Sequence, residues 1–245
     1  MTMTMMTTAK TLISTIKSYI HSAWDVLMPR TCPVCRHALS PGEPYVCRKC
    51  LDNLPRTLFE TRQFNSMEQL FAGKTPIYRA TAYFYYRKRS PYTNIILDTK
   101  YRNSPRLGEW FGAYVASQIL SSGFFQGIHC IIPVPMHSSK LHKRGYNQAD
   151  YIAQGISRVT GIPIAHNVVA VMPHDTQTRK SIYDRWKNTQ GLFDAVNTTE
   201  LENKHVLLVD DVVTTGATLL SCAKTIEAVP GIKVSLMTLA SAVLD

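Results

Sequence analysis

The chain has 245 residues, of which 45% are hydrophobic, and a formal charge of +10; this length suffices for one sizeable core and a small appendage. No apolar run reaches the roughly 20 residues of a membrane span, and Lys17 interrupts the apolar stretch that a secretory signal would need, so we expect a cytoplasmic protein without a membrane span. The excess of Lys and Arg favours anionic partners such as phosphates, nucleotides or nucleic acid, although a solvated basic surface would have the same charge.

The first 28 residues show apolar side chains at spacings of three and four, from Leu12 to Leu27. This spacing predicts an amphipathic helix over residues 1–28. Its polar face carries Ser, Thr and Lys rather than a strongly basic set, which favours docking on protein over a membrane surface.

Four of the six cysteines form two Cys-x2-Cys pairs, at Cys32 and Cys35 and at Cys47 and Cys50. Two such pairs can complete a tetrahedral four-thiolate zinc site, and four protein ligands leave no open position, so the metal would be structural. A redox dithiol or disulfides are the alternatives. We therefore predict a zinc-binding module over residues 29–60. Residues 57–76 lack a clear period, which indicates a linker or an irregular connection.

From residue 77 to 245, strands alternate with helices. Apolar runs predict strands at 78–86, 128–134, 168–172, 192–196, 206–209 and 234–240, and helical periods occur at 95–101, 107–120, 148–159 and 217–228. This alternation predicts an α/β domain with a mostly parallel sheet flanked by helices.

The most informative segment follows the strand 206–209. Asp210 and Asp211 come first, and a short loop rich in Thr and Gly then opens a helix. Carboxylates accept hydrogen bonds from vicinal sugar hydroxyls, whereas the N–H groups and dipole of a helix N-terminus bind phosphate. The predicted phosphate ligands are Thr214, Thr215, Gly216, Ala217 and Thr218.

Three other interpretations of this segment carry less weight. A Walker loop would place a Lys after the glycine, and Gly216 is followed by Ala217. A phosphoacceptor domain would place its acid pair near the start of the domain rather than near its end. A Thr-rich helix cap beside two solvated acids would leave the order of the two chemical parts unexplained.

The stretch VLLVDDVVTTGAT at 206–218 resembles the phosphoribosyl diphosphate (PRPP) signature of type I phosphoribosyltransferases. With IIPVPMHSSKLHKRGYNQAD at 131–150, NTQGLF at 188–193 and the cysteines, the chain resembles the ComF competence-protein family from about residue 25 onward. The resemblance implies a type I phosphoribosyltransferase fold with an N-terminal zinc module, PRPP bound with Mg²⁺, and a link to DNA uptake in some members.

A phosphoribosyltransferase must also hold the leaving diphosphate. Lys143, Arg144 and the amides around Gly145 are the candidates, although a basic surface turn would look the same. By resemblance, Lys100 matches a Lys-Tyr of the family pattern near the ligand, and residues 173–188 correspond to a hood loop carrying Arg179, Lys180 and Arg185.

Residues 78–106 interleave tyrosines with basic side chains, a pattern that suits single-stranded DNA. A half-buried strand with inward tyrosines and solvated arginines is the alternative. Two functions therefore remain open. The protein either transfers phosphoribosyl from PRPP to an acceptor and releases pyrophosphate, or senses PRPP or handles single-stranded DNA without turnover, alongside DNA-uptake proteins.

Overall fold

The computed structural model describes residues 30–101, 104–172 and 191–242. The predicted helix at 1–28 and the hood-loop residues Arg179, Lys180 and Arg185 lie outside the described residues. The chain divides into two compact units, Met1–Asn53 and Leu54–Asp245. The boundary thus falls inside the segment 29–60 that the sequence assigns to the cysteine module. No helix among the described residues is long and apolar enough to cross a membrane.

The first unit is held together by short-range hydrogen bonds. Thr31 and Ala38 form an antiparallel bridge, and helix α2 spans Arg48–Asp52. The carboxylate of Glu43 accepts hydrogen bonds from the backbone N–H groups of Ser40, at 2.8 Å, and Arg48, at 2.7 Å. These bonds fix the loop that leads into α2 without a large apolar core.

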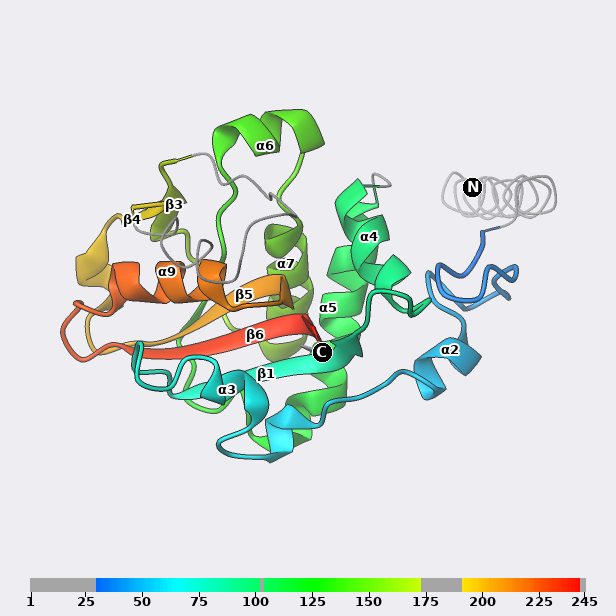
Figure 1. The fold of residues 1–245 in the computed structure, drawn as a ribbon, viewed down its shortest axis with the longest axis horizontal. Coiled ribbons are helices and arrows are strands. Elements are labelled where there is room, and N and C mark those ends of the chain that lie inside the picture. Colours follow the sequence, from blue (N-terminus) through cyan, green and yellow to red (C-terminus); the bar gives the residue numbers. More distant parts are fainter. Residues whose placement is uncertain (1–29, 102–103, 173–190, 243–245) are drawn as a thin grey trace, which may run out of the picture. The chain divides into compact units, whose positions relative to one another are not determined.

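The second unit contains a four-stranded parallel sheet in the order β1-β6-β5-β2. The strands are β1 (Arg79–Tyr86), β2 (Cys130–Pro133), β5 (His205–Val213) and β6 (Lys233–Ala242). A separate antiparallel pair is formed by β3 (Val168–Ala170) and β4 (Phe193–Ala195). The predicted mostly parallel sheet is therefore confirmed, and the carboxyl ends of its strands share one edge, as the arrowheads in Figure 1 show.

Helices cover both faces of this sheet. The helices of the second unit include α4 (Thr93–Tyr101), α5 (Pro105–Ile119), α6 (Ser138–Arg144), α7 (Gln148–Thr160) and α9 (Ala217–Ile226). Figure 1 shows α9 in front of the sheet and α5 and α7 behind it. Side chains along a strand alternate between faces, so Val206 and Leu208 join a buried cluster with Leu219 and Ala223 of α9. Such two-sided burial explains the continuous apolar run that predicts β5.

Glycines let α5 and α7 pack closely. A Cβ added at Gly155 of α7 would lie 2.0 Å from the carbonyl oxygen of Glu109, and one at Gly112 of α5 would lie 2.5 Å from that of Ile152. Both contacts are with backbone atoms, which cannot move aside cheaply. The two helices therefore depend on these glycines for their spacing.

Residues 57–76 form an irregular connection that packs into the core, and not a free linker. This segment forms a 3-10 helix at Phe59–Thr61 and the helix α3 at Ser66–Gln69. Phe59, Met67 and Phe71 are buried. They belong to the same hydrophobic cluster as the side chains between the sheet and α9. Their irregular spacing gives no periodic signal, because tertiary contacts rather than a repeating helix face place them in the core.

The same region also covers the outer edge of β1. The N–H of Thr57 donates to the carbonyl of Tyr83 at 3.1 Å, and the N–H of Tyr85 donates to the carbonyl of Pro55 at 2.9 Å. An exposed edge strand is open to pairing with another chain. Residues 55–57 satisfy part of this edge.

Candidate functional site

Strand β5 continues through the acid pair. The sequence predicts that the strand ends at Val209, but Val212 and Val213 still pair with Ala240 and Ser241 of β6. On the other side, β2 ends at Pro133, the partner of Val209. Asp210 and Asp211 therefore belong to a regular strand that projects beyond the end of its neighbour, at the edge where α/β sheets bind ligands.

The two carboxylates differ in burial and in the groups on which they act. Asp210 is half-buried. Burial of the Cys222 thiol on α9 is the main cause that raises its pKa, and the negative charge of Asp210 raises it further. Asp211 is 2% exposed. Its Oδ2 lies 2.9 Å from Nζ of Lys100, near the end of α4. Asp210 thus acts on α9, and Asp211 holds a cation from α4.

The charges around the pair affect each other strongly. Burial, and then the neighbouring charge of Asp211, raise the pKa of Asp210 to about 7, against the attraction of Lys100. Burial alone would lower the pKa of Lys100, but Asp211 and Asp210 outweigh it and the net pKa is raised. Lys100 therefore remains a cation, and Asp210 exchanges its proton near neutral pH.

The turn after β5 has the form expected of a phosphate site. Gly216 has a φ of 77°, and a Cβ there would lie 3.0 Å from Cζ of Phe71, so both the backbone and the space favour glycine. Thr214 is exposed and Thr218 is half-buried. Helix α9 begins at Ala217 with no acid in its first turn and no side-chain cap from Gly216. The N–H of Ala217 donates to Oγ1 of Thr215 at 3.4 Å, and the helix dipole and the following N–H groups of the first turn favour an anion.

The basic segment is a helix rather than a turn. Helix α6 carries Lys143, which is exposed, and Arg144, and it ends at Gly145 with a φ of 84°. The guanidinium of Arg144 donates a hydrogen bond to Oε1 of Gln148 and lies 5.2 Å from the centre of the Tyr101 ring. Contacts therefore run from Asp211 through Lys100 and its neighbour Tyr101 to Arg144.

Two residues that no motif singled out support this arrangement. The hydroxyl of Tyr146 donates to the carbonyl of Thr99 at 2.7 Å, which ties the end of α6 to the end of α4. Asn147 donates to the carbonyl of Val134 and accepts from the N–H of Ala149, so it caps α7. The preference for Asn at helix N-caps could have identified Asn147. Tyr146 has no such local signal.

The strip of tyrosines and basic residues does not form one surface. Tyr83 and Phe84 are buried, and the guanidinium of Arg79 donates to the carbonyl of Glu60 at 2.8 Å. The exposed cations at 87–89 follow β1, at the same edge of the sheet as the acid pair. The half-buried strand is thus the better description of residues 79–86.

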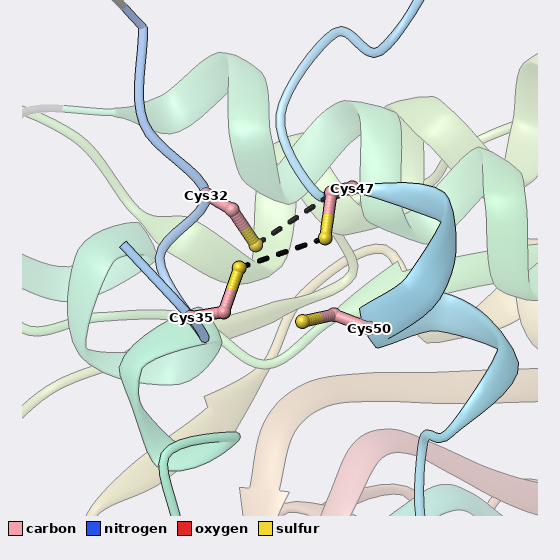
Figure 2. A group of neighbouring side chains, drawn as sticks. All are labelled: Cys32, Cys35, Cys47 and Cys50. Carbon is pink, nitrogen blue, oxygen red and sulfur yellow. Dashed lines mark hydrogen bonds between the residues drawn. The ribbon is translucent and has the colours of Figure 1, made fainter. Parts of the chain in front are cut away.

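The four clustered cysteines form the second candidate site (Figure 2). Their sulfur atoms all lie within 4.8 Å of one another, and those of Cys35 and Cys47 are 3.7 Å apart. Sulfurs in a tetrahedral zinc site are about 3.8 Å apart, given Zn–S bonds of about 2.3 Å. The N–H of Cys47 also donates to the sulfur of Cys32 at 3.5 Å. These four residues could hold a metal ion.

The four cysteines differ in burial. Cys32 and Cys50 are buried, Cys47 is half-buried and Cys35 is exposed. A hydrogen bond from the backbone of His37 is the largest cause that lowers the pKa of Cys35 to about 6, and burial raises the pKa of Cys50. Metal binding would deprotonate all four thiols.

The chain is similar to several known proteins. Residues 141–242 match the phosphoribosyl transferase domain family. The chain is 44% identical over 96 residues to competence protein F of Haemophilus influenzae, which covers 38% of this chain and 42% of that protein. It is 30% identical over 95 residues to the DNA utilization protein YhgH of Salmonella typhi, covering 38% and 41%. A solved hypoxanthine phosphoribosyltransferase from Staphylococcus aureus has 15% identity and a TM-score of 0.36, covering 63% of this chain and 73% of that one.

The chain spans about two-fifths of the length of these two curated relatives. Within that span the matches confirm the resemblance to the ComF competence proteins and the presence of a phosphoribosyl transferase domain.

Proposed function

We propose that this homologue of competence protein F, with its phosphoribosyl transferase domain, binds PRPP together with Mg²⁺ and transfers the phosphoribosyl group to an acceptor, releasing pyrophosphate. One observation carries the proposal. A carboxylate, a tight glycine turn and a helix N-terminus without an acid in its first turn follow one another at the carboxyl edge of a parallel sheet. This order matches the hydroxyls and the 5-phosphate of a phosphorylated ribose.

Each part of PRPP has a proposed partner. The 5-phosphate lies against the turn at 214–218, where N–H groups and hydroxyls converge. The acid pair 210–211 lies at the sugar, and Asp210 is the less buried of the two. Lys100, Arg144, the exposed Lys143 and the amides around Gly145 lie at the diphosphate. Mg²⁺ would bind the diphosphate oxygens, since it prefers phosphate and water as ligands.

The proposed reaction exchanges one bond at C1 of the ribose. The acceptor forms a bond to C1 while the bond from C1 to the diphosphate oxygen breaks, and the diphosphate leaves with that electron pair. Cations at the diphosphate stabilise the negative charge that develops on it. Lys100 suits this role because the acid pair keeps it charged.

Thr218→Asp tests the phosphate site without weakening the fold. An acid in the first turn of α9 favours the helix by about 0.3–1 kcal/mol, but it repels a phosphate at the same place. We expect calorimetry to show loss of Mg–PRPP binding with an unchanged or higher melting temperature. Thr225→Asp, in the last turn of α9, is the matched control and should bind PRPP normally. Retained affinity in Thr218→Asp would refute the site.

A non-catalytic role is the second candidate. The exposed cations at 87–89 lie at the ligand edge of the sheet, and one relative is named for DNA utilization. PRPP binding without pyrophosphate release over a panel of acceptors would favour sensing. Single-stranded DNA binding that falls steeply with salt, and weakens when Arg87, Lys88 and Arg89 become Ala, would favour DNA handling.

We also propose that the metal held by the four cysteines is zinc in a structural role. The four thiolates and their spacing suit tetrahedral Zn²⁺ and leave no position for a substrate. One zinc ion per purified chain, measured by mass spectrometry, is the expected stoichiometry.

A further inference from the structure

Two residues between α2 and β1 adopt a backbone conformation that their side chains disfavour. Leu58 has a φ of 59° and Phe64 a φ of 55°. Both values lie in the left-handed region, which glycine and asparagine tolerate and which is uncommon for a bulky apolar residue. The other non-glycine residues with a positive φ in the described part of the chain are Arg36, Asn197 and Asn203. Leu58 and Phe64 are thus the two apolar residues in this set.

The same two side chains are turned away from the core. Phe64 is 69% exposed and Leu58 is 42% exposed, whereas Phe59 is buried in the core cluster. Phe64 precedes Asn65, the N-cap of α3, and an apolar residue at this position often packs on the fourth residue of the helix. That residue is Gln69, whose amide instead donates to the carbonyl of Phe64 at 3.0 Å. Burial therefore does not offset the backbone strain at either position.

Hydrogen bonds hold residues 58–64, which we call the apolar loop, in a fixed conformation. Nδ2 of the buried Asn65 donates to the carbonyl of Ala80 on β1 at 2.9 Å and to that of Arg62 at 3.2 Å. The N–H and the hydroxyl of Thr61 both donate to the carbonyl of Leu58, at 3.2 and 2.9 Å. A loop that is already ordered loses little conformational entropy when a partner binds it.

Arg62 supplies the accessible charge of the apolar loop. It is exposed and forms no ion pair with any residue that the structure describes. The two acids of this stretch are occupied, since Glu60 is buried with the guanidinium of Arg56 at 2.7 Å and Glu68 lies 3.6 Å from Nε of Arg79. An acidic surface is therefore complementary to the loop, and a basic surface is not.

We propose that the apolar loop is a docking site for another protein, which contributes an apolar patch rimmed by Asp or Glu. Aromatic side chains and Arg are enriched in protein interfaces, and Phe64 and Arg62 are of these types. A second copy of this chain is a poorer match. A symmetric contact would bring Arg62 against Arg62 between two chains that each carry a formal charge of +10.

Asparagine substitutions separate a docking role from a structural one. Asn tolerates a left-handed φ, so Leu58→Asn and Phe64→Asn should each raise the thermal midpoint, by about 2–4 °C. Leu120→Asn is the matched control, because Leu120 is 48% exposed but has an ordinary φ of −55° at the end of α5; its midpoint should stay the same or fall. A lower midpoint in Phe64→Asn would show that this ring stabilises the fold, and would overturn the proposal.

Site-specific photocrosslinking in the cells that express the protein identifies the partner. The full chain would carry p-benzoylphenylalanine in place of Phe64 or, as the control, in place of Leu120. The expected adduct is one protein, seen only from position 64, whose crosslinked segment combines apolar residues with Asp or Glu. An adduct with a second copy, within the chain itself or with lipid alone, equal adducts from both positions, or no adduct would each refute the proposal.

Calorimetry with the purified partner then measures the contribution of each side chain. Phe64→Asn should weaken binding about tenfold or more, and Arg62→Glu should weaken it more at low salt than at high salt, because screening reduces charge repulsion. Leu120→Asn should bind as wild type does. Unchanged affinity in both Phe64→Asn and Arg62→Glu would overturn the docking role. No step uses PRPP, so a failure of the proposed function leaves these results unaffected.

Discussion

Asp210→Asn should stabilise the protein at neutral pH while it removes ligand binding. Burial and the charge of Asp211 raise the pKa of Asp210 from its ordinary 3.8 to about 7 in the folded chain, and this net direction already includes the attraction of Lys100. Between these two values the folded state holds a proton that the unfolded state has lost. Stability therefore falls as pH rises through this window, and the full penalty applies above about pH 7.

The size of this penalty follows from the two pKa values. At about 1.36 kcal/mol per pKa unit, the difference between 3.8 and about 7 corresponds to at most about 4 kcal/mol. Asp210 is half-buried, and water around it reduces this figure. We expect Asp210→Asn to raise the free energy of unfolding by about 1–3 kcal/mol at pH 8 and by much less at pH 4.5.

Urea unfolding followed by circular dichroism, at pH 4.5 and pH 8, measures this difference. Asp194→Asn is the matched control, because its carboxylate also accepts a hydrogen bond from the next N–H, that of Ala195, at 2.8 Å, but in an exposed position. The control should change stability equally at both pH values. An Asp210→Asn variant that is no more stable than wild type at pH 8, or whose gain does not grow with pH, would refute the assigned electrostatics.

Two further outcomes are expected. Gly216→Ala should lower the free energy of unfolding by about 1–3 kcal/mol, because of the left-handed φ of 77° and the 3.0 Å approach to Phe71; an unchanged urea midpoint would contradict this. Chelation of the metal should let a protease cut within residues 30–53 and leave a resistant fragment that begins near Leu54. Full protease resistance of the metal-free chain would contradict a structural zinc.

The regular elements of the second unit were predictable because their signals are local. The apolar run at 206–209 and the helical period at 148–159 each correspond to an observed element, β5 and α7. Helix α6 was missed because it has no buried residue and therefore no apolar period. It is instead defined by its ends, where His137 accepts a hydrogen bond from Ser139 and Gly145 adopts a positive φ.

The candidate site likewise has one part with a local sequence signal and other parts without one. The turn at 214–218 is one continuous segment, so residue types alone indicate its chemistry. The partners around it come from distant parts of the chain: Phe71 packs behind Gly216, and Lys100 pairs with Asp211. Neither contact leaves a trace in the local sequence, because it depends on how α3 and α4 pack around the sheet.

The end of β5 decides how the acid pair must be interpreted. Asp is a poor strand former, so the sequence predicts that the strand ends at Val209, and two acids in a loop could turn to the same ligand. The pairing of Val212 and Val213 with β6 instead carries the strand past the acids, so both acids belong to an ordered backbone. Asp211 is almost completely buried and its Oδ2 lies 2.9 Å from Nζ of Lys100, whereas Asp210 is only partly buried. The two acids therefore differ in burial and in partners, although residue types alone present them as equivalent.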